Sequence, residues 1–273
     1  MSCGARRSSG LPKVCDCTTV RLPTAGLPVL DAHAHLPGDV TLSQITALGE
    51  ATVFAMTFSL EEANRVRDRR DPTIVWGVGL HPREATARDG WNPEQFRVLL
   101  DSFALVGEIG LDDRGDNFAQ QRSIFKELLT LVRGQPVLLS IHSSGATTEV
   151  VQHLLEEPPS GAILHWFNGD LHDITKSVEL SAYFSVNAAM AEEQIRQMPI
   201  ERVLCETDSP ARSPKARGPA DVNAVEQLLS RAWKASVEEV PHATTWSNLR
   251  TLSEASGAIE RMPGPVVDRL LSL

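Results

Sequence analysis

The chain has 273 residues, of which 42% are hydrophobic, and it carries a formal net charge of −9. This length and apolar content predict one large α/β barrel or two modest domains with a sizeable core. The acidic balance argues against broad, non-specific binding of duplex nucleic acid through a basic surface. It does not exclude a nucleic-acid substrate, because bound divalent ions would add local positive charge that this count omits.

Residues 1–28 are rich in Ser, Gly, Pro and Thr and show no apolar period, so we expect a flexible N-terminal arm. Arg6 and Arg7 are followed by polar residues, Gly and Pro instead of the apolar core of a signal peptide. No apolar run approaches the roughly 18 residues that a membrane span needs. The four cysteines have no disulfide-framework spacing, which favours a reducing, cytoplasmic location.

From residue 29 onward, apolar runs alternate with amphipathic stretches. The predicted strands are residues 29–32, 51–58, 73–80, 104–109, 137–141, 162–167, 182–186 and 202–205. Their near-continuous apolarity suits parallel strands that are covered on both faces. Helical periodicity marks residues 117–132, 147–155, 170–180 and 221–235, with Asn92 and Asp221 as predicted N-caps. The alternation predicts a single (β/α)₈ TIM barrel over residues 29–273, in which residues 236–273 add helices that close the barrel.

Metal-type ligands stand at the ends of these predicted strands. They are His33 and His35 after the first strand, His81 after the third, Glu108 after the fourth, His142 after the fifth, His165 after the sixth and Asp208 after the eighth. The carboxyl ends of barrel strands meet at one face, and that face carries the chemistry. Since side chains alternate with period two along a strand, we expect His33 and His35 to point together into the barrel mouth.

This mixture of donors predicts a two-metal hydrolase. Neutral imidazole and carboxylate bind zinc, manganese or iron, and carboxylate also suits magnesium. Glu108, on a central strand, is the candidate bridge between two divalent ions that activate water for attack. Asp208 is the candidate acceptor of the water's proton as well as a ligand of one ion.

The remaining candidates have weaker signals. His81 is expected either to contact substrate or support a metal ligand, or else to have a structural role alone. Asp31 and Glu206 are expected to orient a ligand or a water, or else to make strand-end and loop-cap hydrogen bonds. Trp166 is expected to fill the barrel, with stacking on a terminal base as the alternative.

Four further residues are expected to take no part in the chemistry. His153, His172 and His242 lie in helical patterns and are predicted to be surface residues. Cys205 lies inside the eighth predicted strand, which makes it a buried, inert thiol.

Six ordered motifs together resemble the TatD family of metal-dependent deoxyribonucleases, within the amidohydrolase-like barrel superfamily. They are DAHAHL at 31–36, GLHP at 79–82, GEIGLD at 107–112, IHS at 141–143, LHWFNG at 164–169 and LCETDSP at 204–210, with residues 121–125 also matching. The resemblance covers residues 30–252, nearly the whole chain after the arm.

The resemblance implies a ligand set and an activity. His33, His35 and Asp208 would hold one metal ion, His142 and His165 the other, and Glu108 would be shared. Members of the family cut phosphodiester bonds of DNA, often from the 3′ side, usually with magnesium or manganese. Some members act on RNA ends or on D-aminoacyl-tRNA.

A narrower likeness is carried by LSIHSS at 139–144, HWFNG at 165–169 and FSVNAAM at 184–190. These segments resemble the QatD branch, whose members belong to multi-gene bacterial anti-phage systems beside an ATPase and a QueC-like protein. The likeness implies an antiviral defence context and protein partners.

Two positions depart from the family pattern. The family commonly has an Arg two residues after the fifth-strand His, where this chain has Ser144, and an aromatic residue where this chain has Asp113. Both changes remove groups that could hold a phosphate or stack on a base. Three basic residues after the eighth strand are candidates to compensate by binding phosphate, namely Arg212, Lys215 and Arg217. The alternative is that they belong to a merely solvated loop.

The sequence therefore favours a metal-dependent phosphodiesterase that acts on DNA, on single strands or 3′ ends. Two other readings stay open. An amidohydrolase or esterase acting on a small molecule or an aminoacyl-tRNA would use similar ligands, because such barrels support both carbonyl and phosphorus chemistry. Alternatively, the chain is a partner-dependent subunit of a defence complex with little activity alone.

Overall fold

The computed structural model describes residues 26–210, 216–236 and 241–273, apart from the side chains of 241–243. Within these residues eight parallel strands pair in chain order. They are β1 (Leu30–His35), β2 (Thr52–Met56), β3 (Ile74–Val78), β4 (Leu105–Gly110), β5 (Leu138–His142), β6 (Ala162–Leu164), β7 (Tyr183–Val186) and β8 (Val203–Cys205). Residues 1–25 of the expected arm lie outside the described residues.

The sheet closes on itself between β1 and the chain that follows β8. The backbone N–H of Asp208 donates to the carbonyl oxygen of His33 at 2.9 Å, and that of His35 donates to the carbonyl oxygen of Ser209 at 2.7 Å. These bonds continue the parallel ladder past the end of β8. The predicted (β/α)₈ TIM barrel is confirmed, and the same bonds place Asp208 beside the two histidines of β1.

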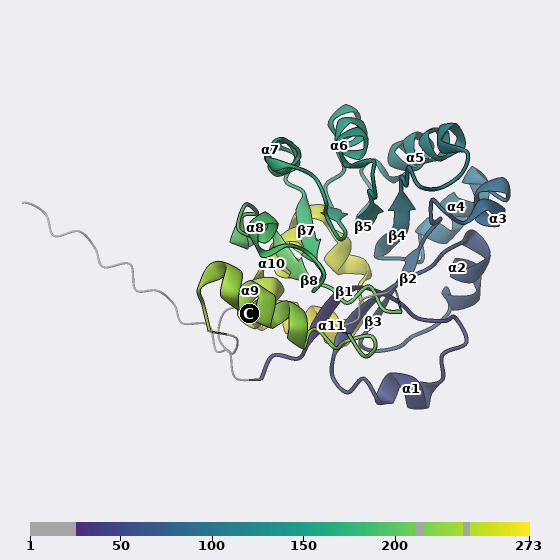
Figure 1. The fold of residues 1–273 in the computed structure, drawn as a ribbon. Helices are drawn as coiled ribbons and strands as arrows, with labels where there is room; N and C mark the ends of the chain where they lie inside the picture. The colour runs from purple at the N-terminus through teal and green to yellow at the C-terminus, as the bar shows by residue number, and fades with distance from the viewer. Residues whose placement is uncertain (1–25, 211–215, 237–240) are drawn as a thin grey trace, which may run out of the picture.

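Helices surround the strands as an outer layer (Figure 1). They are α1 (Leu42–Thr46), α2 (Leu60–Val66), α3 (Ala85–Asp89), α4 (Pro93–Leu100), α5 (Phe118–Val132), α6 (Thr147–Glu156), α7 (Leu171–Glu179), α8 (Glu192–Ile195), α9 (Asn223–Trp233), α10 (Pro241–Ser256) and α11 (Gly264–Leu271), with 3₁₀ turns at Ile200–Arg202 and Ala258–Arg261. No helix of the described residues combines the length and the apolar character that crossing a membrane requires.

The two predicted N-caps have different outcomes. Asn92 caps α4 as expected, since its side chain accepts a hydrogen bond from the backbone N–H of Gln95. The prediction for Asp221 is wrong, because α9 begins two residues later and Val222 occupies its N-cap position. The Asp221 carboxylate instead accepts hydrogen bonds from the backbone N–H of Arg217 and the side chain of Asn223, at 3.0 and 2.9 Å.

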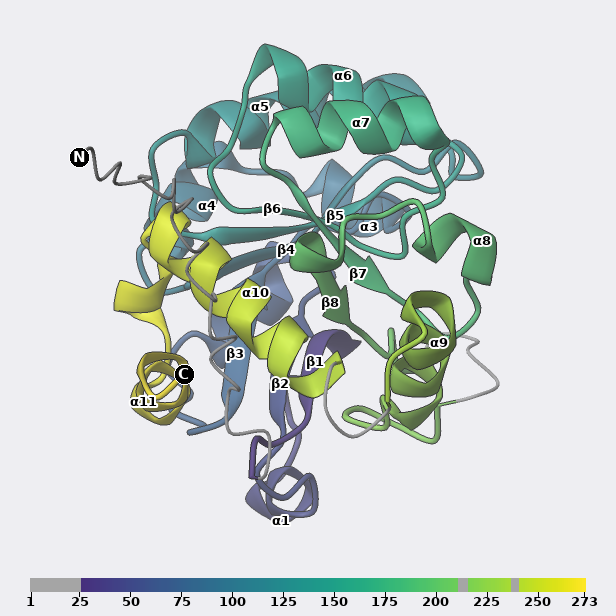
Figure 2. The ribbon, with the colours of Figure 1, turned by 90° about the vertical axis from the view of Figure 1, so that its left-hand side faces the viewer.

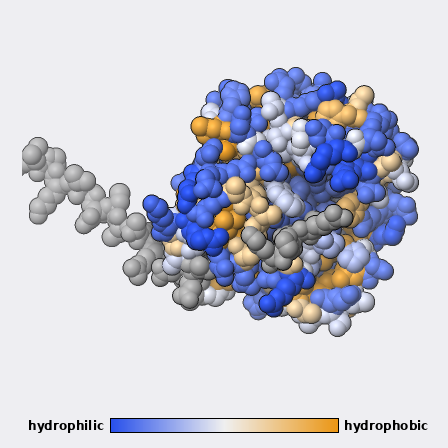
Figure 3. Space-filling model, in the orientation of Figure 1, coloured by the Kyte–Doolittle hydropathy of each residue, from blue (hydrophilic) through white to orange (hydrophobic). Residues whose placement is uncertain are grey.

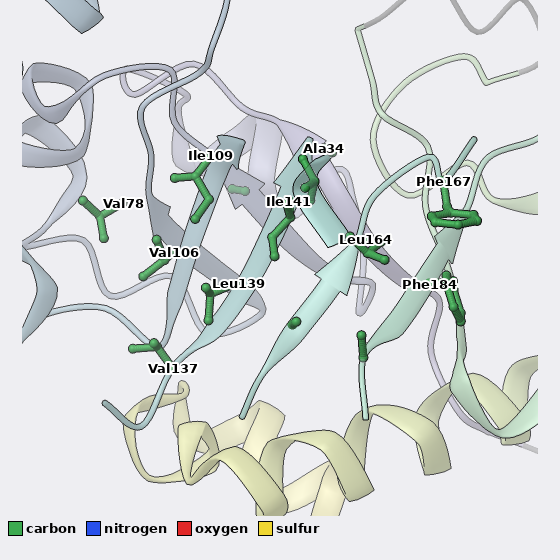
Figure 4. Close-up of a cluster of buried hydrophobic side chains, with 14 of the residues drawn as sticks. Ala34, Val78, Val106, Ile109, Val137, Leu139, Ile141, Leu164, Phe167 and Phe184 are labelled. Atoms are coloured by element: carbon green, nitrogen blue, oxygen red, sulfur yellow. The ribbon is translucent and has the colours of Figure 1, made fainter. Parts of the chain in front are cut away.

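Two hydrophobic clusters hold the barrel together. The larger cluster lies between the strands and the outer helices and includes Val106, Leu139, Phe125 and Phe184; Figure 4 shows its members on neighbouring strands. The smaller cluster packs the residues that point into the barrel against α10 and α11. Figure 2 shows α10 running across that end of the strands. Fully burying each large side chain contributes about 1.5–3 kcal/mol, so the strands are anchored on both faces.

The face of the molecule in Figure 3 is mainly hydrophilic, with apolar residues in small separate areas.

The structure places His153 in the interior. The prediction that His153 is a surface residue is wrong, because the residue is only 6% exposed and its ring lies 6.0 Å from that of Phe125. Helix α6 packs this face against the barrel, which the sequence pattern did not reveal. His172 is exposed and Cys205 is buried, as expected, and the side chain of His242 lies outside the described residues.

Candidate metal centre

A register shift in β1 turns its two histidines into the barrel mouth. Leu30 and Ala32 point into the barrel, so simple alternation would put His33 and His35 on the outer face. Pairing with β2 shifts by one residue between Asp31 and Ala34, and Ala34 then packs in the outer cluster. The extra residue reverses the alternation, so that His33 and His35 share the inner side.

A register shift in β4 likewise turns Glu108 into the barrel mouth. Leu105 points inward, Ile109 packs in the outer cluster, and the pairing with β5 shifts between Val106 and Ile109. The backbone of the shifted segment is held from the side, since Thr57 donates its N–H to the oxygen of Gly107 and accepts from the N–H of Glu108, at 3.1 and 3.2 Å. The carboxylate of Glu108 therefore points into the mouth, although strict alternation of side chains from Leu105 would turn it to the outer face.

Gly110 allows β4 to approach β5 at the level of the site. Its φ of 138° lies in a region that side chains rarely adopt, and a Cβ there would come within 2.0 Å of the carbonyl oxygen of His142. The next residue, Leu111, donates its N–H to that same oxygen at 3.0 Å. This glycine is thus needed to bring the ends of the two strands together.

The Glu108 carboxylate is the centre of a ring of imidazoles. His35 Nε2 and His33 Nε2 lie 3.1 and 3.4 Å from Oε2, His165 Nε2 and His81 Nε2 lie 3.3 and 3.5 Å from Oε1, and His142 Nδ1 contacts Oε1. Only 1% of Glu108 is exposed. Five imidazoles, from β1, β5 and the segments that follow β3 and β6, therefore converge on one buried carboxylate.

Asp208 approaches this ring from the other side. Its Oδ1 lies 3.6 Å from His33 Nε2 and 3.7 Å from His35 Nε2. Its φ of 51° is left-handed, a conformation that non-glycine residues adopt rarely. The ligand atoms of three groups lie within 4.8 Å of one another, and these groups are His33–His35–Asp208, His33–Glu108–His165 and His81–Glu108–His142.

Polar partners fix which nitrogen three of the rings present. Ser140 Oγ contacts His33 Nδ1 at 2.7 Å and Glu206 contacts His165 Nδ1 at 3.2 Å, so both rings turn Nε2 toward the centre. His142 is reversed, because the Asp112 carboxylate holds its Nε2 at 2.9 Å and leaves Nδ1 for the centre. Such outer partners set the tautomer and the basicity of metal-binding histidines.

The other two histidines and Asp31 have different surroundings from the three rings that polar partners orient. His35 stacks on Phe58 with ring centroids 4.2 Å apart. His81 Nδ1 accepts the backbone N–H of Arg83 at 3.1 Å, so the neutral ring carries its proton on Nε2 and suits a hydrogen-bond donor better than a ligand. Asp31 reaches no ligand side chain: its carboxylate accepts from Thr207 and from the Ala220 backbone, which steadies the segment before Asp208.

Burial shapes the charge states. Burial, with help from nearby His165, lowers the pKa of His33 to about 3, which keeps the ring in its neutral, metal-binding form. Burial also raises the pKa of Asp208 to about 7, against the opposing influence of His165 and with help from the negative charge of Glu108. Burial opposes ionisation of Glu108, but the surrounding histidines, His81 and His165 first, hold the pKa of that carboxyl well below its usual value.

The donor set fits divalent cations. Among the described residues, Glu108, Asp208 and Glu206 form ion pairs with histidines alone and with no Lys or Arg. Buried carboxylates without a fixed cation are costly unless a metal or another charge balances them. Mixed imidazole and carboxylate sets of this kind suit zinc, manganese or iron, and the carboxylates suit magnesium.

A cavity of about 860 Å³ lies over the centre. Its lining includes six residues of the centre, and also Phe58, Arg83, Arg114, Ser143, Ser144, Trp166, Asn168 and Pro210. Trp166 is half-buried at the wall, so it both packs on the barrel and borders the cavity. Arg217 is exposed and is not part of the lining, and Arg212 and Lys215 lie outside the described residues.

The sequence did not single out several residues that the structure places at the site. Asp112, Ser140 and Ser185 support the histidines and Glu206, and Arg83 and Arg114 stand at the rim. Asp112 carried the clearest signal, since it is a carboxylate two residues past the end of β4. The two arginines follow strands 3 and 4 in loops, where the sequence gives no orientation.

Comparisons with known proteins agree with this geometry. The family model described as TatD related DNase matches residues 30–253. The deoxyribonuclease TATDN3 of Homo sapiens is 23% identical over 265 residues, covering 83% of this chain and 95% of its own. The uncharacterized metal-dependent hydrolase YabD of Bacillus subtilis is 26% identical over 246 residues, covering 80% and 96%.

Solved structures show the same fold. The crystal structure of YJJV, a TatD homolog from Escherichia coli K12, has a TM-score of 0.71 and 21% identity, covering 82% of this chain and 97% of its own. A TatD family hydrolase from Entamoeba histolytica has a TM-score of 0.64 and 16% identity, covering 83% and 98%. With a family model that spans all eight strands and a histidine–carboxylate centre at the barrel mouth, the chain belongs to the TatD-related deoxyribonucleases, a family of metal-dependent hydrolases.

Proposed function

We propose that this protein hydrolyses phosphodiester bonds of DNA, with single strands or 3′ ends as its substrates and two divalent ions as its cofactors. The observation that carries the proposal is the convergence of His33, His35, His142, His165 and Asp208 on the buried carboxylate of Glu108. The relatives that are named deoxyribonucleases add support.

The positions of the side chains support a separate role for each of them in metal binding. His33, His35 and Asp208 would hold one ion, His142 and His165 the other, and Glu108 would bridge them. Bound magnesium, manganese or zinc would neutralise phosphate oxygens and make water easier to ionise.

The remaining steps depend on the protein's own groups. Asp208 Oδ1 lies 3.6 Å from His33 Nε2 and 3.7 Å from His35 Nε2, so its carboxylate would be in place to take a proton from the attacking water. His81 presents an Nε2–H at the same centre and would donate it to a phosphate oxygen.

End-labelled single-stranded DNA tests the proposal. The purified protein is incubated with magnesium, manganese or zinc beside Glu108→Gln and the control Glu94→Gln, whose side chain is 76% exposed on α4. We expect metal-dependent trimming that falls about a thousandfold or more in Glu108→Gln, because the bridge loses its charge, and that is unchanged in Glu94→Gln. Full activity of Glu108→Gln would refute the bridging role.

Ser144 keeps a second candidate function open. Where the family commonly supplies an Arg, the cavity here has a small hydroxyl, which is less suited to a phosphate. An amidohydrolase or esterase acting on a small molecule or an aminoacyl-tRNA is this alternative. Hydrolysis of an ester or amide panel without any cleavage of DNA would establish it. No hydrolysis at all, with metal still bound, would instead indicate a subunit that needs partner proteins.

We further propose that the enzyme acts in bacterial anti-phage defence together with other proteins of a Qat-type system. The support is the likeness of residues 139–144, 165–169 and 184–190 to the QatD branch. Plating efficiency of phage on cells that carry the gene with its neighbours, in wild-type and Glu108→Gln forms, tests this. Equal plating on both strains and on cells without the genes would refute the defence role.

A further inference from the structure

Two arginines stand together at the rim of the cavity. Arg83 follows β3 and Arg114 follows β4, and both line the cavity above the metal centre. Their side chains are 55% and 66% exposed. On a chain with a net charge of −9, the pair places two cations at the mouth of the site.

Both arginines are anchored to the same buried carboxylate. Asp112 Oδ1 accepts the backbone N–H of Arg114 at 2.9 Å and lies 3.5 Å from its Nε, and Asp112 Oδ2 lies 4.0 Å from Arg83 Nε. Asp112 is fully buried and also contacts His142 Nε2 at 2.9 Å. One carboxylate thus connects a metal-type ligand to both cations.

The guanidinium ends of the pair remain available. Among the described residues, no carboxylate, carbonyl or hydroxyl forms a hydrogen bond with an Nη atom of Arg83 or Arg114. Each side chain therefore lies with its Nε within 4.0 Å of Asp112 and leaves its outer N–H donors for a ligand. Planar arginine donors match the oxygens of a phosphate.

The two loops behave as one unit. Arg88, only 2% exposed, contacts the carbonyl oxygen of Pro82 and the carboxylate of Asp116, and so joins the loop after β3 to the loop after β4. Gln121 accepts from the N–H of Asp112 and donates to the oxygen of Asp116, each at 2.9 Å. These buried contacts fix the two loops that carry the arginines before any substrate arrives, which lowers the entropic cost of binding.

The position of the pair relative to His142 indicates which phosphate it would meet. His142 Nδ1 faces Glu108 while Nε2 faces Asp112, so the width of one imidazole ring separates the arginine anchor from the metal centre. A phosphate at the metals would not be the one that the arginines reach best. Ser144 lies on the same wall, and its carbonyl oxygen accepts the N–H of Asp113 at 3.1 Å, so the loop that carries Arg114 stands beside Ser144.

We propose that Arg83 and Arg114 bind the phosphate next to the one being cleaved, and that they make the site selective for a nucleotide strand over an isolated phosphodiester. The inference rests on the proposed nuclease function. It assigns the strand contact to the loops after β3 and β4.

Kinetics on two substrates test the inference. Wild type, Arg83→Ala, Arg114→Ala and the double variant are compared on a short oligothymidylate and on bis(p-nitrophenyl) phosphate, which has a single phosphate. For the double variant we expect KM on the oligonucleotide to rise about tenfold or more with little change in kcat, because charge-assisted contacts to the strand are lost. On the single phosphodiester, kcat/KM falls several-fold less.

Controls separate a strand contact from damage to the metal centre. Arg97→Ala removes an exposed arginine, paired with Glu94 on α4, and keeps wild-type kinetics on both substrates. Metal content of the double variant matches wild type, and adding Ser144→Arg to it restores part of the affinity. Equal losses on both substrates, or a double variant with wild-type KM on the oligonucleotide, would overturn the inference.

A binding measurement keeps the inference testable if the enzyme cleaves no DNA. Fluorescence anisotropy with a labelled phosphorothioate oligonucleotide compares wild type and the double variant over a range of salt concentrations. Weaker binding by about tenfold, with a salt slope smaller by about 0.7 for each lost contact, supports the arginine role even where the nuclease proposal fails. No binding by wild type, or equal binding by both, refutes it.

Discussion

The two ends of the barrel are built from the same eight strands but differ in what they bury: charged and polar groups at the mouth, and apolar side chains at the other end. At the mouth, Glu108, Asp208 and Glu206 are buried among histidines, and a cavity of about 860 Å³ stands open above them. At the other end, α10 covers the strands with Trp246 and Leu249, both fully buried, in an apolar cluster. Stability therefore concentrates at one end, which lets the other end carry costly buried charges.

Removing Trp246 tests the stabilising end and has the largest expected effect. Trp246→Ala leaves a cavity and frees the carbonyl oxygen of Pro28, which now accepts the indole N–H at 2.8 Å. We expect the free energy of unfolding to fall by about 3–5 kcal/mol, measured by urea denaturation, while kcat of the folded enzyme stays at the wild-type value. Trp246→Phe, which keeps most of the packing, should cost about 1 kcal/mol for the lost hydrogen bond. A large loss of kcat in either variant would show that the two ends are not independent.

Adding metal tests whether the residues at the barrel mouth bind a divalent ion and thereby stabilise the folded protein. Manganese at about a hundred times its dissociation constant should raise the free energy of unfolding of the chelator-treated protein by about 2.7 kcal/mol, because only the folded state holds the ligands together. Trp246→Ala should gain the same increment, since effects at distant sites add, and Glu108→Gln should gain much less. Thermal denaturation with and without metal measures all three. An unequal gain in Trp246→Ala would contradict the separation of the two ends.

Asp112→Asn tests how the centre is supported and has the smallest expected effect. The carboxylate holds His142 Nε2, and burial, which would raise its pKa, is outweighed by the bonds from His142 and the Arg114 backbone, so that the pKa falls to about 2. Loss of that charge should lower metal affinity or activity about 10–100-fold with little change in stability. Isothermal titration with manganese measures the affinity, and Asp68→Asn, at an 85% exposed side chain after α2, is the matched control. Unchanged affinity would mean that His142 needs no orienting partner.

Much of the fold was readable from the sequence because it depends on local patterns. The alternation of apolar runs and amphipathic stretches predicts the (β/α)₈ barrel, and the N-cap at Asn92 follows from its chemistry alone. Asp221 and His153 were mispredicted because the start of α9 and the burial of one face of α6 depend on neighbours that are distant in sequence.

The sequence by itself determined which histidines and carboxylates stand at the strand ends, since a parallel barrel brings those ends to one face. It did not determine which way the ligands point. Continued alternation from Leu30 and Leu105 would turn His33 and Glu108 outward, and only the register shifts in β1 and β4, which form when each strand pairs with its neighbour, turn them into the mouth. The arginine pair on Asp112 likewise exists only once two loops, joined through Arg88, are packed together.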